Sequence, residues 1–299
     1  MSSFFISLYA VECLNHINKV PYYFITYKQL IIRPLYQNHL LKMKKLLLFI
    51  FIVFTANQYL AAQNELFLKK EFISKSDTLR YRILFPDNYD ITKKYPLVLF
   101  LHGSGERGSD NMKQLVHGSY LFTNQENRKD FPAIVIFPQC PSNDFWAPIN
   151  DRSTGKFSYV NAKHPTKAMQ LVIDLTKSII KKEAVDSKRV YVIGLSMGGM
   201  GTFDLICREP KLFAAAVPIC GGVNNERLKK VKKMPIRIYH GEIDPVVPLE
   251  HSKSAYETLK SFGSKKCELI VFPETGHNSW DQAFKQPDFV SWIFSKKLK

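Results

Sequence analysis

The stretch RVYVIGLSMGGMGTFDL, residues 189–205, gives the strongest indication of architecture in this chain of 299 residues. Its apolar run Val190–Ile193 is typical of a strand that is buried on both faces. The segment Gly194–Gly198 then fits the pattern G-x-S-x-G, a sharp turn from strand to helix that raises the hydroxyl of Ser196 above a sheet. Glycine at both ends of the turn removes Cβ atoms that would collide as the strand and the helix approach each other, and Gly199 and Gly201 extend this relief.

Short apolar runs of the same kind recur along the chain and predict further strands. They are residues 79–85, 97–101, 133–137, 214–219, 236–239 and 269–272, of which Leu79–Phe85 alternates apolar and polar residues, as an edge strand does. Helical patterns lie between them at His164–Ala184 and, more weakly, at Ser252–Phe262 and Asp281–Phe294. Strands that alternate with helices predict a mostly parallel sheet with helices on both faces. Ligands of such sheets collect at the carboxyl ends of the strands.

Two further polar residues follow predicted strands and offer Ser196 the partners that it needs. A serine hydroxyl is a nucleophile at neutral pH only when a base takes its proton, and the base needs an orienting group. Asp244 lies in the loop after the strand 236–239, and His277 in the loop after the strand 269–272. The chain order serine, aspartate, histidine is that of α/β hydrolases. Four nearby residues remain alternatives for the acid and the base: Glu242, Glu274, His240 and His251.

An ester attacked by the serine becomes a tetrahedral oxyanion, which needs donors fixed in advance. One candidate donor is the N–H group of Met197, at the start of the helix that follows the turn. The strand Leu97–Leu101 runs directly into the glycine-rich segment HGSGERG, residues 102–108. The N–H group of Ser104 is therefore the second candidate donor.

The formal net charge of +16 invites an interpretation as a protein that binds nucleic acid or a membrane surface, but the lysines are scattered and nucleic acid is not expected as a partner. The densest lysine groups carry no interleaved aromatic residues and are interpreted as a solvated surface. They are Lys229, Lys230, Lys232 and Lys233, and Lys296, Lys297 and Lys299. No HExxH motif and no cluster of histidine and cysteine occurs, so neither a metal nor another cofactor is expected. Cys140, Cys207, Cys220 and Cys267 have no CxxC spacing, and the sequence leaves their disulfide state open.

The first 62 residues are expected to lie outside the folded domain. From Met43 the chain reads as a signal peptide, with a basic start, the apolar run Leu46–Ala56 and a small-residue cleavage site near Ala62. The apolar run is too short for a stable membrane span. We therefore divide the chain into a leader, 1–42, a signal peptide, 43–62, and a catalytic domain, 63–299. Translation is hypothesised to start at Met43, and the mature protein to be secreted or periplasmic.

Five segments together resemble a known family. The segments are LHGSGERG, FPQCP with the nearby Trp146, GLSMGGMGTF, HGEIDPVVP and ETGHNSW. They are similar to the small secreted bacterial esterases of the α/β-hydrolase fold, the phospholipase/carboxylesterase-like and feruloyl-esterase-like group related to prolyl oligopeptidases. The resemblance implies Ser196 as nucleophile, His277 as base and Asp244 as its partner, with an oxyanion hole formed by Ser104 and Met197. The related dienelactone hydrolases carry a cysteine as nucleophile.

The expected function is hydrolysis of carboxylic esters without a cofactor. Since no long insertion precedes Asp244, no large lid domain is expected, and an open cleft suits short acyl or aryl esters, including esters linked to polysaccharide. Phe145 and Trp146 are candidates for the wall of a substrate pocket, with a place in the core as the alternative. A serine peptidase of the prolyl-oligopeptidase type and a non-catalytic binding module on the same fold remain alternative functions.

Overall fold

The computed structural model describes residues 41–51, 64–74, 76–153 and 156–299. The chain divides into two compact units, residues 1–61 and residues 62–299. In the first unit, residues 41–51 form a helix that overlaps the predicted signal peptide. The predicted cleavage site near Ala62 and almost all of the predicted leader lie outside the described residues. Within the described ranges, no helix combines the length and the apolar character needed to cross a membrane.

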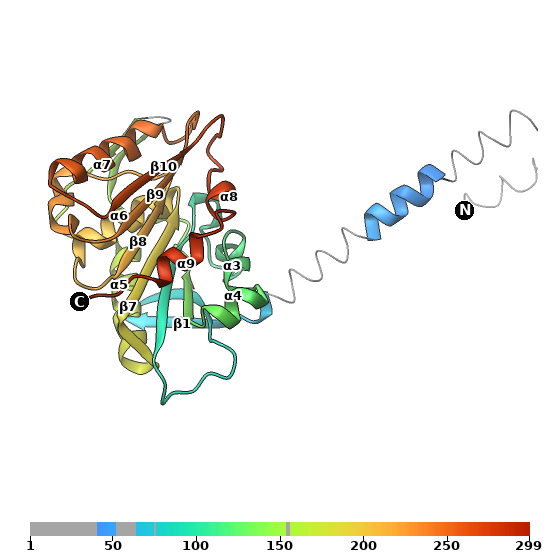
Figure 1. Ribbon diagram of the computed structural model, residues 1–299. Coiled ribbons are helices and arrows are strands. Elements are labelled where there is room, and N and C mark those ends of the chain that lie inside the picture. Colours follow the sequence, from blue (N-terminus) through green and yellow to red (C-terminus); the bar gives the residue numbers. More distant parts are fainter. Residues whose placement is uncertain (1–40, 52–63, 75, 154–155) are drawn as a thin grey trace, which may run out of the picture. The chain divides into compact units, whose positions relative to one another are not determined.

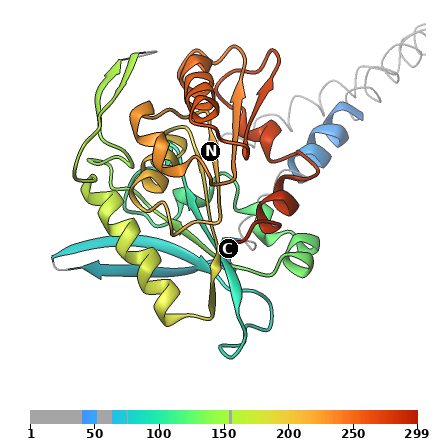
Figure 2. The ribbon, with the colours of Figure 1, turned by 60° about the vertical axis from the view of Figure 1, so that its left-hand side comes forward.

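The second unit is built on an eight-stranded sheet with the order β1-β2-β4-β3-β7-β8-β9-β10 (Figure 1). The strands are β1 (Leu68–Ser74), β2 (Asp77–Leu84), β3 (Tyr95–Leu101), β4 (Ile134–Pro138), β7 (Val185–Leu195), β8 (Ala215–Ile219), β9 (Ile236–Gly241) and β10 (Cys267–Phe272). Pairing is antiparallel at β1–β2 and β2–β4 and parallel at every other neighbouring pair. The predicted mostly parallel sheet is thus confirmed. A separate hairpin of β5 (Ile149–Ser153) and β6 (Lys156–Tyr159) projects from the unit, in light green in Figure 2.

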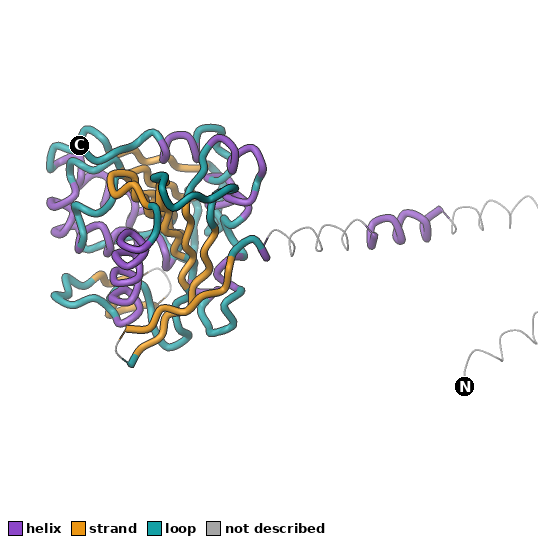
Figure 3. Tube along the Cα trace, turned by 90° about the horizontal axis from the view of Figure 1, so that it is seen from below, coloured by secondary structure: helices purple, strands orange, loops and turns teal. Residues whose placement is uncertain are grey.

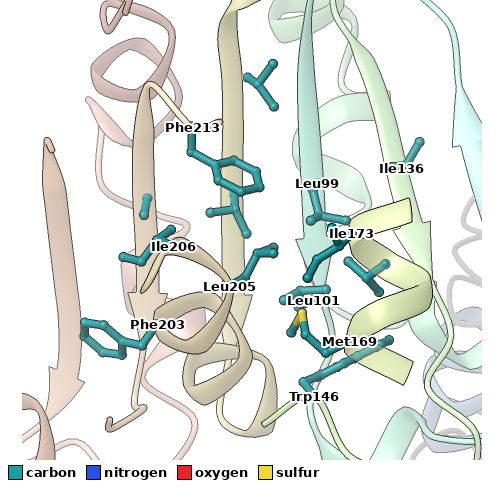
Figure 4. Packing of buried hydrophobic residues seen from close by; sticks show 14 of the residues in the cluster. Leu99, Leu101, Ile136, Trp146, Met169, Ile173, Phe203, Leu205, Ile206 and Phe213 are labelled. Atoms are coloured by element: carbon teal, nitrogen blue, oxygen red, sulfur yellow. The ribbon is translucent and has the colours of Figure 1, made fainter. Parts of the chain in front are cut away.

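Helices cover both faces of this sheet, as Figures 1 and 3 show. They are the α-helices α3 (Tyr120–Thr123), α4 (Gln125–Asp130), α5 (Lys167–Lys182), α6 (Met197–Arg208), α7 (Leu249–Ser261), α8 (Trp280–Ala283) and α9 (Phe289–Phe294), with the short 3-10 helices η2 (Ser104–Glu106), η3 (Lys113–Leu115) and η4 (Asn225–Val231). Alternate residues of β3 point to opposite faces. Leu99 packs in a core cluster with α5 and α6, as Figure 4 shows, and this cluster also includes residues of α7. Phe100 packs in a second cluster with α3, α8 and α9. Between α6 and Asp244 the chain forms only β8, η4 and β9, so no lid domain stands over this part of the sheet.

Local sequence explains where the main covering helix begins. The side chain of Thr166 accepts a hydrogen bond from the N–H group of Met169, which caps the first turn of α5. The helix therefore starts after Thr166 rather than at the predicted His164, and it buries Leu171, Leu175 and other residues of its apolar face against the sheet.

Three sequence-based expectations about the elements were wrong. Strand β2 is an inner strand, because β1 pairs along it on one side and β4 on the other. Strand β1 was missed, since its residues are mostly exposed and carry no buried pattern. The helix expected over Asp281–Phe294 is two short helices, α8 and α9, separated at Pro287. Proline lacks an N–H group and disfavours a helical conformation in the residue before it.

Three cysteines of the domain that the structure describes are buried free thiols: Cys207, Cys220 and Cys267. Cys140 is buried as well.

Candidate active site

The turn between β7 and α6 holds Ser196 in a strained backbone conformation, with φ 54° and ψ −117°. L-residues other than glycine rarely adopt positive φ. The close approach predicted for the flanking glycines is confirmed. A Cβ atom on Gly198 would lie 1.9 Å from the carbonyl oxygen of Leu101, and one on Gly194 would lie 2.2 Å from the carbonyl oxygen of Gly198. The turn therefore needs glycine at both positions.

Ser196, His277 and Asp244 form one hydrogen-bonded chain across three loops at the carboxyl edge of the sheet. The Oγ atom of Ser196 lies 2.8 Å from Nε2 of His277. The Nδ1 atom of His277 lies 2.8 Å from Oδ2 of Asp244. The Asp244 side chain is fully buried, whereas the His277 side chain is 21% exposed. The imidazole thus connects a buried carboxylate to a hydroxyl near the surface.

The carboxylate of Asp244 is held in its charged form by four donors. Its Oδ1 accepts hydrogen bonds from the N–H groups of Val246 and Val247, both at 2.9 Å. Its Oδ2 faces His277 and also His240, whose Nε2 is 3.4 Å away. Burial by itself raises the pKa of Asp244, but the hydrogen bonds outweigh burial and hold the pKa well below its usual range.

The four alternative acids and bases make other contacts. Glu242 accepts a hydrogen bond from the N–H group of Glu274, and both residues are exposed. His240 is fully buried, with Nδ1 2.7 Å from Ser252 Oγ and Nε2 2.7 Å from the carbonyl oxygen of Val247. His251 packs edge-on against the rings of the β5–β6 hairpin. The imidazole that contacts Ser196 is that of His277.

Ser104 and Met197 occupy equivalent places, each at the first residue of a helix. Met197 begins α6 directly after Ser196, and Ser104 begins η2 directly after β3 and His102–Gly103. N–H groups in the first turn of a helix have no acceptor within that helix. A Cβ atom on Gly103 would lie 3.8 Å from Cβ of Ser196, so the η2 loop runs beside the serine.

His102, which sequence reasoning left without a role, anchors the η2 loop from beneath. Its Nε2 accepts a hydrogen bond from the N–H group of Cys140 at 3.0 Å. Its Nδ1 lies 2.6 Å from the carbonyl oxygen of Gly103 and therefore carries the hydrogen. Burial lowers the pKa of His102 to about 4, so the ring is neutral at ordinary pH. The only sequence signal for this role was its position between a buried strand and a glycine.

Trp146 does not form a pocket wall, contrary to the sequence-based expectation. Its ring has no exposed surface and lies in the core (Figure 4). It packs edge-on against His102 at 5.1 Å between ring centroids. The Nε1–H group donates to the carbonyl oxygen of His102 at 3.0 Å. Trp146 thus supports the η2 loop from the side that faces away from solvent.

Sequence reasoning also missed that Arg107 holds the η2 loop in place. The guanidinium of Arg107 donates to the carbonyl oxygens of Ser104 at 3.0 Å and Ser142 at 3.1 Å. The same group lies 4.2 Å from the centroid of the partly buried Phe145 ring. Phe145 therefore supports Arg107, and through it the position of Ser104.

One group of potential metal ligands occurs among the described residues. Single ligand atoms of Cys220, Asp244 and His277 lie within 4.8 Å of one another. Burial raises the pKa of the Cys220 thiol to about 12, so the sulfur is protonated at neutral pH and is a poor ligand. Asp244 and His277 are already hydrogen-bonded to each other. This geometry suits transfer of a proton from Ser196 better than it suits a metal ion.

Comparison with known proteins relates the chain to one family. A model of the phospholipase/carboxylesterase family matches residues 89–290. The chain is 26% identical over 213 residues to the probable feruloyl esterase C of Aspergillus niger, a match that covers 70% of this chain and 69% of the fungal protein. It is 25% identical over 218 residues to the carboxylesterase SOBER1 of Arabidopsis thaliana, covering 68% of this chain and 90% of the plant protein.

Solved structures agree on the fold. The crystal structure of a thermostable esterase is 32% identical, with a TM-score of 0.73, and the match covers 79% of this chain and 64% of that chain. An acylaminoacyl peptidase is 17% identical with a TM-score of 0.52, covering 78% of this chain and 42% of that chain. The second likeness concerns the fold alone. Both structures place the α/β-hydrolase architecture on the second unit of this chain.

Proposed function

The chain belongs to the phospholipase/carboxylesterase family, and from this membership we propose that it hydrolyses carboxylic esters with Ser196 as nucleophile, His277 as base and Asp244 as the partner of the base. The observation that carries the proposal is the pair of 2.8 Å contacts that join Ser196 to His277 and His277 to Asp244. Such a chain is the arrangement that activates a serine hydroxyl at neutral pH.

In the first half of the reaction, Ser196 Oγ attacks the carbonyl carbon of the ester and its proton passes to Nε2 of His277. The buried carboxylate of Asp244 stabilises the imidazolium through Nδ1–H. The N–H groups of Ser104 and Met197 bind the negative oxygen of the tetrahedral intermediate. When this intermediate collapses, the bond to the alcohol oxygen breaks and His277 returns the proton to the leaving alcohol. The product is an acyl-enzyme.

In the second half, water takes the place of the alcohol. His277 removes a proton from the water molecule, whose oxygen attacks the acyl carbon. Collapse of the second intermediate releases the carboxylic acid, and Nε2 returns its proton to Ser196 Oγ. The 21% exposure of the His277 side chain lets water reach this position.

The substrate class is proposed to be short acyl or aryl esters, including esters linked to polysaccharide. Ile243 and Val246, on the loop that carries Asp244, are 61% and 42% exposed. They offer apolar surface to the substrate beside the reacting groups. The similarity to a probable feruloyl esterase supports aryl esters such as ferulates among these substrates. The segment 43–62 supports export of a bacterial type, with removal of the signal peptide near Ala62.

Hydrolysis of p-nitrophenyl acetate by the purified protein and by its Ser196→Ala variant tests the proposal. A loss of roughly 10³-fold or more in kcat is expected. The exposed Ser261 on α7 supplies a matched control, since Ser261→Ala should leave the rate unchanged. Equal rates in the wild type and Ser196→Ala would favour a non-catalytic binding module.

A parallel assay separates an esterase from a peptidase, since the same residues can serve both reactions. Release of ferulate from a feruloylated oligosaccharide is expected to exceed cleavage of a peptide anilide, measured as kcat/KM. Preference for the anilide would assign the chain to the serine peptidases of this fold.

A further inference from the structure

Three groups of lysines that are far apart in the sequence surround one groove. The groove has a volume of about 630 Å³, which is within the range of small-molecule binding sites. From the sequence alone, these lysines belong to a scattered solvated surface. The lysines that line the groove are Lys230, Lys232, Lys233, Lys265, Lys266, Lys297 and Lys299.

The groove lies at the edge of the sheet opposite Ser196. Its lining residues Ala214, Pro235 and Lys266 directly precede the strands β8, β9 and β10, whereas the residues of the candidate active site follow strand ends. A five-residue strand spans about 17 Å, twice the Debye length of about 8 Å at physiological salt. Figure 4 shows the corresponding separation in the core, with Phe213 of the groove floor at one end and Trp146 at the other. A ligand in the groove therefore does not cover Ser196.

The positive charge of the groove is almost entirely uncompensated. No aspartate or glutamate side chain lines it. Among the described residues, the only ion pair made by a lysine of the groove joins Lys297 to Asp186, at 3.8 Å. Like charges this close repel one another, so a bound anion would stabilise the cluster.

The chain around the groove is held in place. The N–H group of Leu298 donates to the carbonyl oxygen of Lys188, and the hydroxyl of Tyr191 donates to the carbonyl oxygen of Lys296 at 2.7 Å. The N–H group of Ile236 donates to the carbonyl oxygen of Lys266. Backbone contacts thus hold the chain in place at two of the three lysine groups, at Lys266 and at Lys296–Leu298.

We propose that this groove binds an acidic polysaccharide. The repeating carboxylates of the polysaccharide pair with the lysines, and the C–H faces of its sugar rings lie on the half-buried Pro210, Pro235 and Leu298. A linear chain can enter the hollow, whereas a bilayer is flat on this scale and reaches only the rim. The groove has no exposed aromatic side chain on which nucleic-acid bases could stack. The groove also has no arginine, the residue whose planar fork best matches phosphate. The site goes beyond the proposed ester hydrolysis, and it would hold a charged polymer while Ser196 acts on the same or a neighbouring chain.

The test compares two variants with the same change in net charge. The groove variant carries Lys→Gln at Lys230, Lys233, Lys266 and Lys299. The control variant carries Lys→Gln at four exposed lysines outside the groove: Lys69, Lys93, Lys182 and Lys253. Binding of fluorescently labelled polygalacturonate is measured by anisotropy between 50 and 500 mM NaCl, with single-stranded DNA and vesicles of anionic lipid as competing ligands.

The groove variant is expected to lose at least tenfold in affinity for polygalacturonate, and the control variant less than twofold. Equal losses in both variants would mean that only net charge matters and would overturn the site. Tighter binding of DNA or of vesicles, lost in the groove variant, would overturn the assignment to polysaccharide. Hydrolysis of p-nitrophenyl acetate by both variants should match the wild type, which shows that they are folded and separates this proposal from the catalytic one.

Discussion

His240 places its Nε2 atom 3.4 Å from Oδ2 of Asp244, the same oxygen that lies 2.8 Å from His277. The carbonyl oxygen of Val247, 2.7 Å from this Nε2, can only accept a hydrogen bond, so Nε2 of His240 carries a hydrogen. A second, fully buried imidazole therefore supports both the carboxylate and the loop that carries it. His240 is a positioning residue for Asp244.

Removing the side chain of His240 should slow the reaction without abolishing it. In His240→Ala, kcat is expected to fall roughly tenfold to a hundredfold, the effect of one hydrogen bond to a charged group, while KM changes little. His240→Gln should restore most of kcat, because its amide can donate from nearly the same place. Steady-state kinetics of the two variants check this. His251→Ala, which changes a half-buried histidine that does not contact Asp244, serves as control.

Equal losses in His240→Ala and His240→Gln, or a loss of the same size in His251→Ala, would show that packing rather than a hydrogen bond to Asp244 is responsible.

The role proposed for the N–H group of Ser104 can be isolated from its side chain. Ser104→Pro removes the N–H group, whereas Ser104→Ala keeps it. Proline is tolerated at the first helical position, and the extended conformation of Gly103, with φ −76° and ψ −178°, suits a residue that precedes proline. The loss of one oxyanion donor should lower kcat by roughly 10²- to 10³-fold in the proline variant only. Kinetics and thermal melts of both variants provide the measurement. Unchanged kcat in a folded Ser104→Pro protein would remove Ser104 from the oxyanion hole.

Stability should depend on pH through His102. Its pKa in the folded protein is about 4, below the ordinary value of 6.5, so the unfolded chain binds more protons between these values. The contribution of His102 is fully present above pH 6.5 and is lost as the pH falls toward 4. It amounts to about 3 kcal/mol in the free energy of unfolding. In His102→Gln, the rise in the free energy of unfolding between pH 4 and pH 6.5 that comes from His102 should disappear. Urea unfolding at pH 4.5, 5.5, 6.5 and 7.5 measures this slope of the free energy of unfolding against pH.

The exposed His164 provides the control for this experiment, since His164→Gln should keep the slope of the wild type. A slope that persists unchanged in His102→Gln would contradict the neutral, buried state of His102.

Trp146→Phe distinguishes a supporting role from a role in the substrate pocket. The substitution leaves the buried carbonyl oxygen of His102 without its donor, at a cost of about 1–3 kcal/mol in stability. A supporting role predicts a lower melting temperature and a lower kcat with an unchanged order of preference among acetate, butyrate and ferulate esters. A changed order of preference would restore Trp146 to the substrate pocket. Trp292→Phe, near Arg237 in the other core cluster, is the control for the loss of an indole.

The sequence predicts the inner parallel strands well because they are continuous apolar runs. Strand β3 is buried at every position, and a run of this kind has few alternatives to a central strand. Strand β1 could not be predicted, since its stability comes from antiparallel pairing with β2 rather than from a buried face. The same unseen partner made β2 resemble an edge strand.

Within the candidate site, too, some residues could be predicted from the sequence and others could not. Ser196, Asp244 and His277 could be named because each follows a recognisable strand, and order along the chain already limits which loops can meet. The supporting contacts of His102, Trp146 and Arg107 join residues 35 to 44 positions apart through single hydrogen bonds. Nothing in local composition encodes such contacts. The lysine groove is a further example, since its charges gather only when three strands start at the same edge.

The buried free thiols of the domain bear on how this protein can be handled. Burial raises the pKa of Cys207, Cys220 and Cys267 to about 12, so these thiols form almost no thiolate at neutral pH and resist oxidants. None of these three thiols is in a disulfide, so a reducing agent is not expected to weaken the fold around them. The domain should therefore fold alike in reducing and in oxidising buffer.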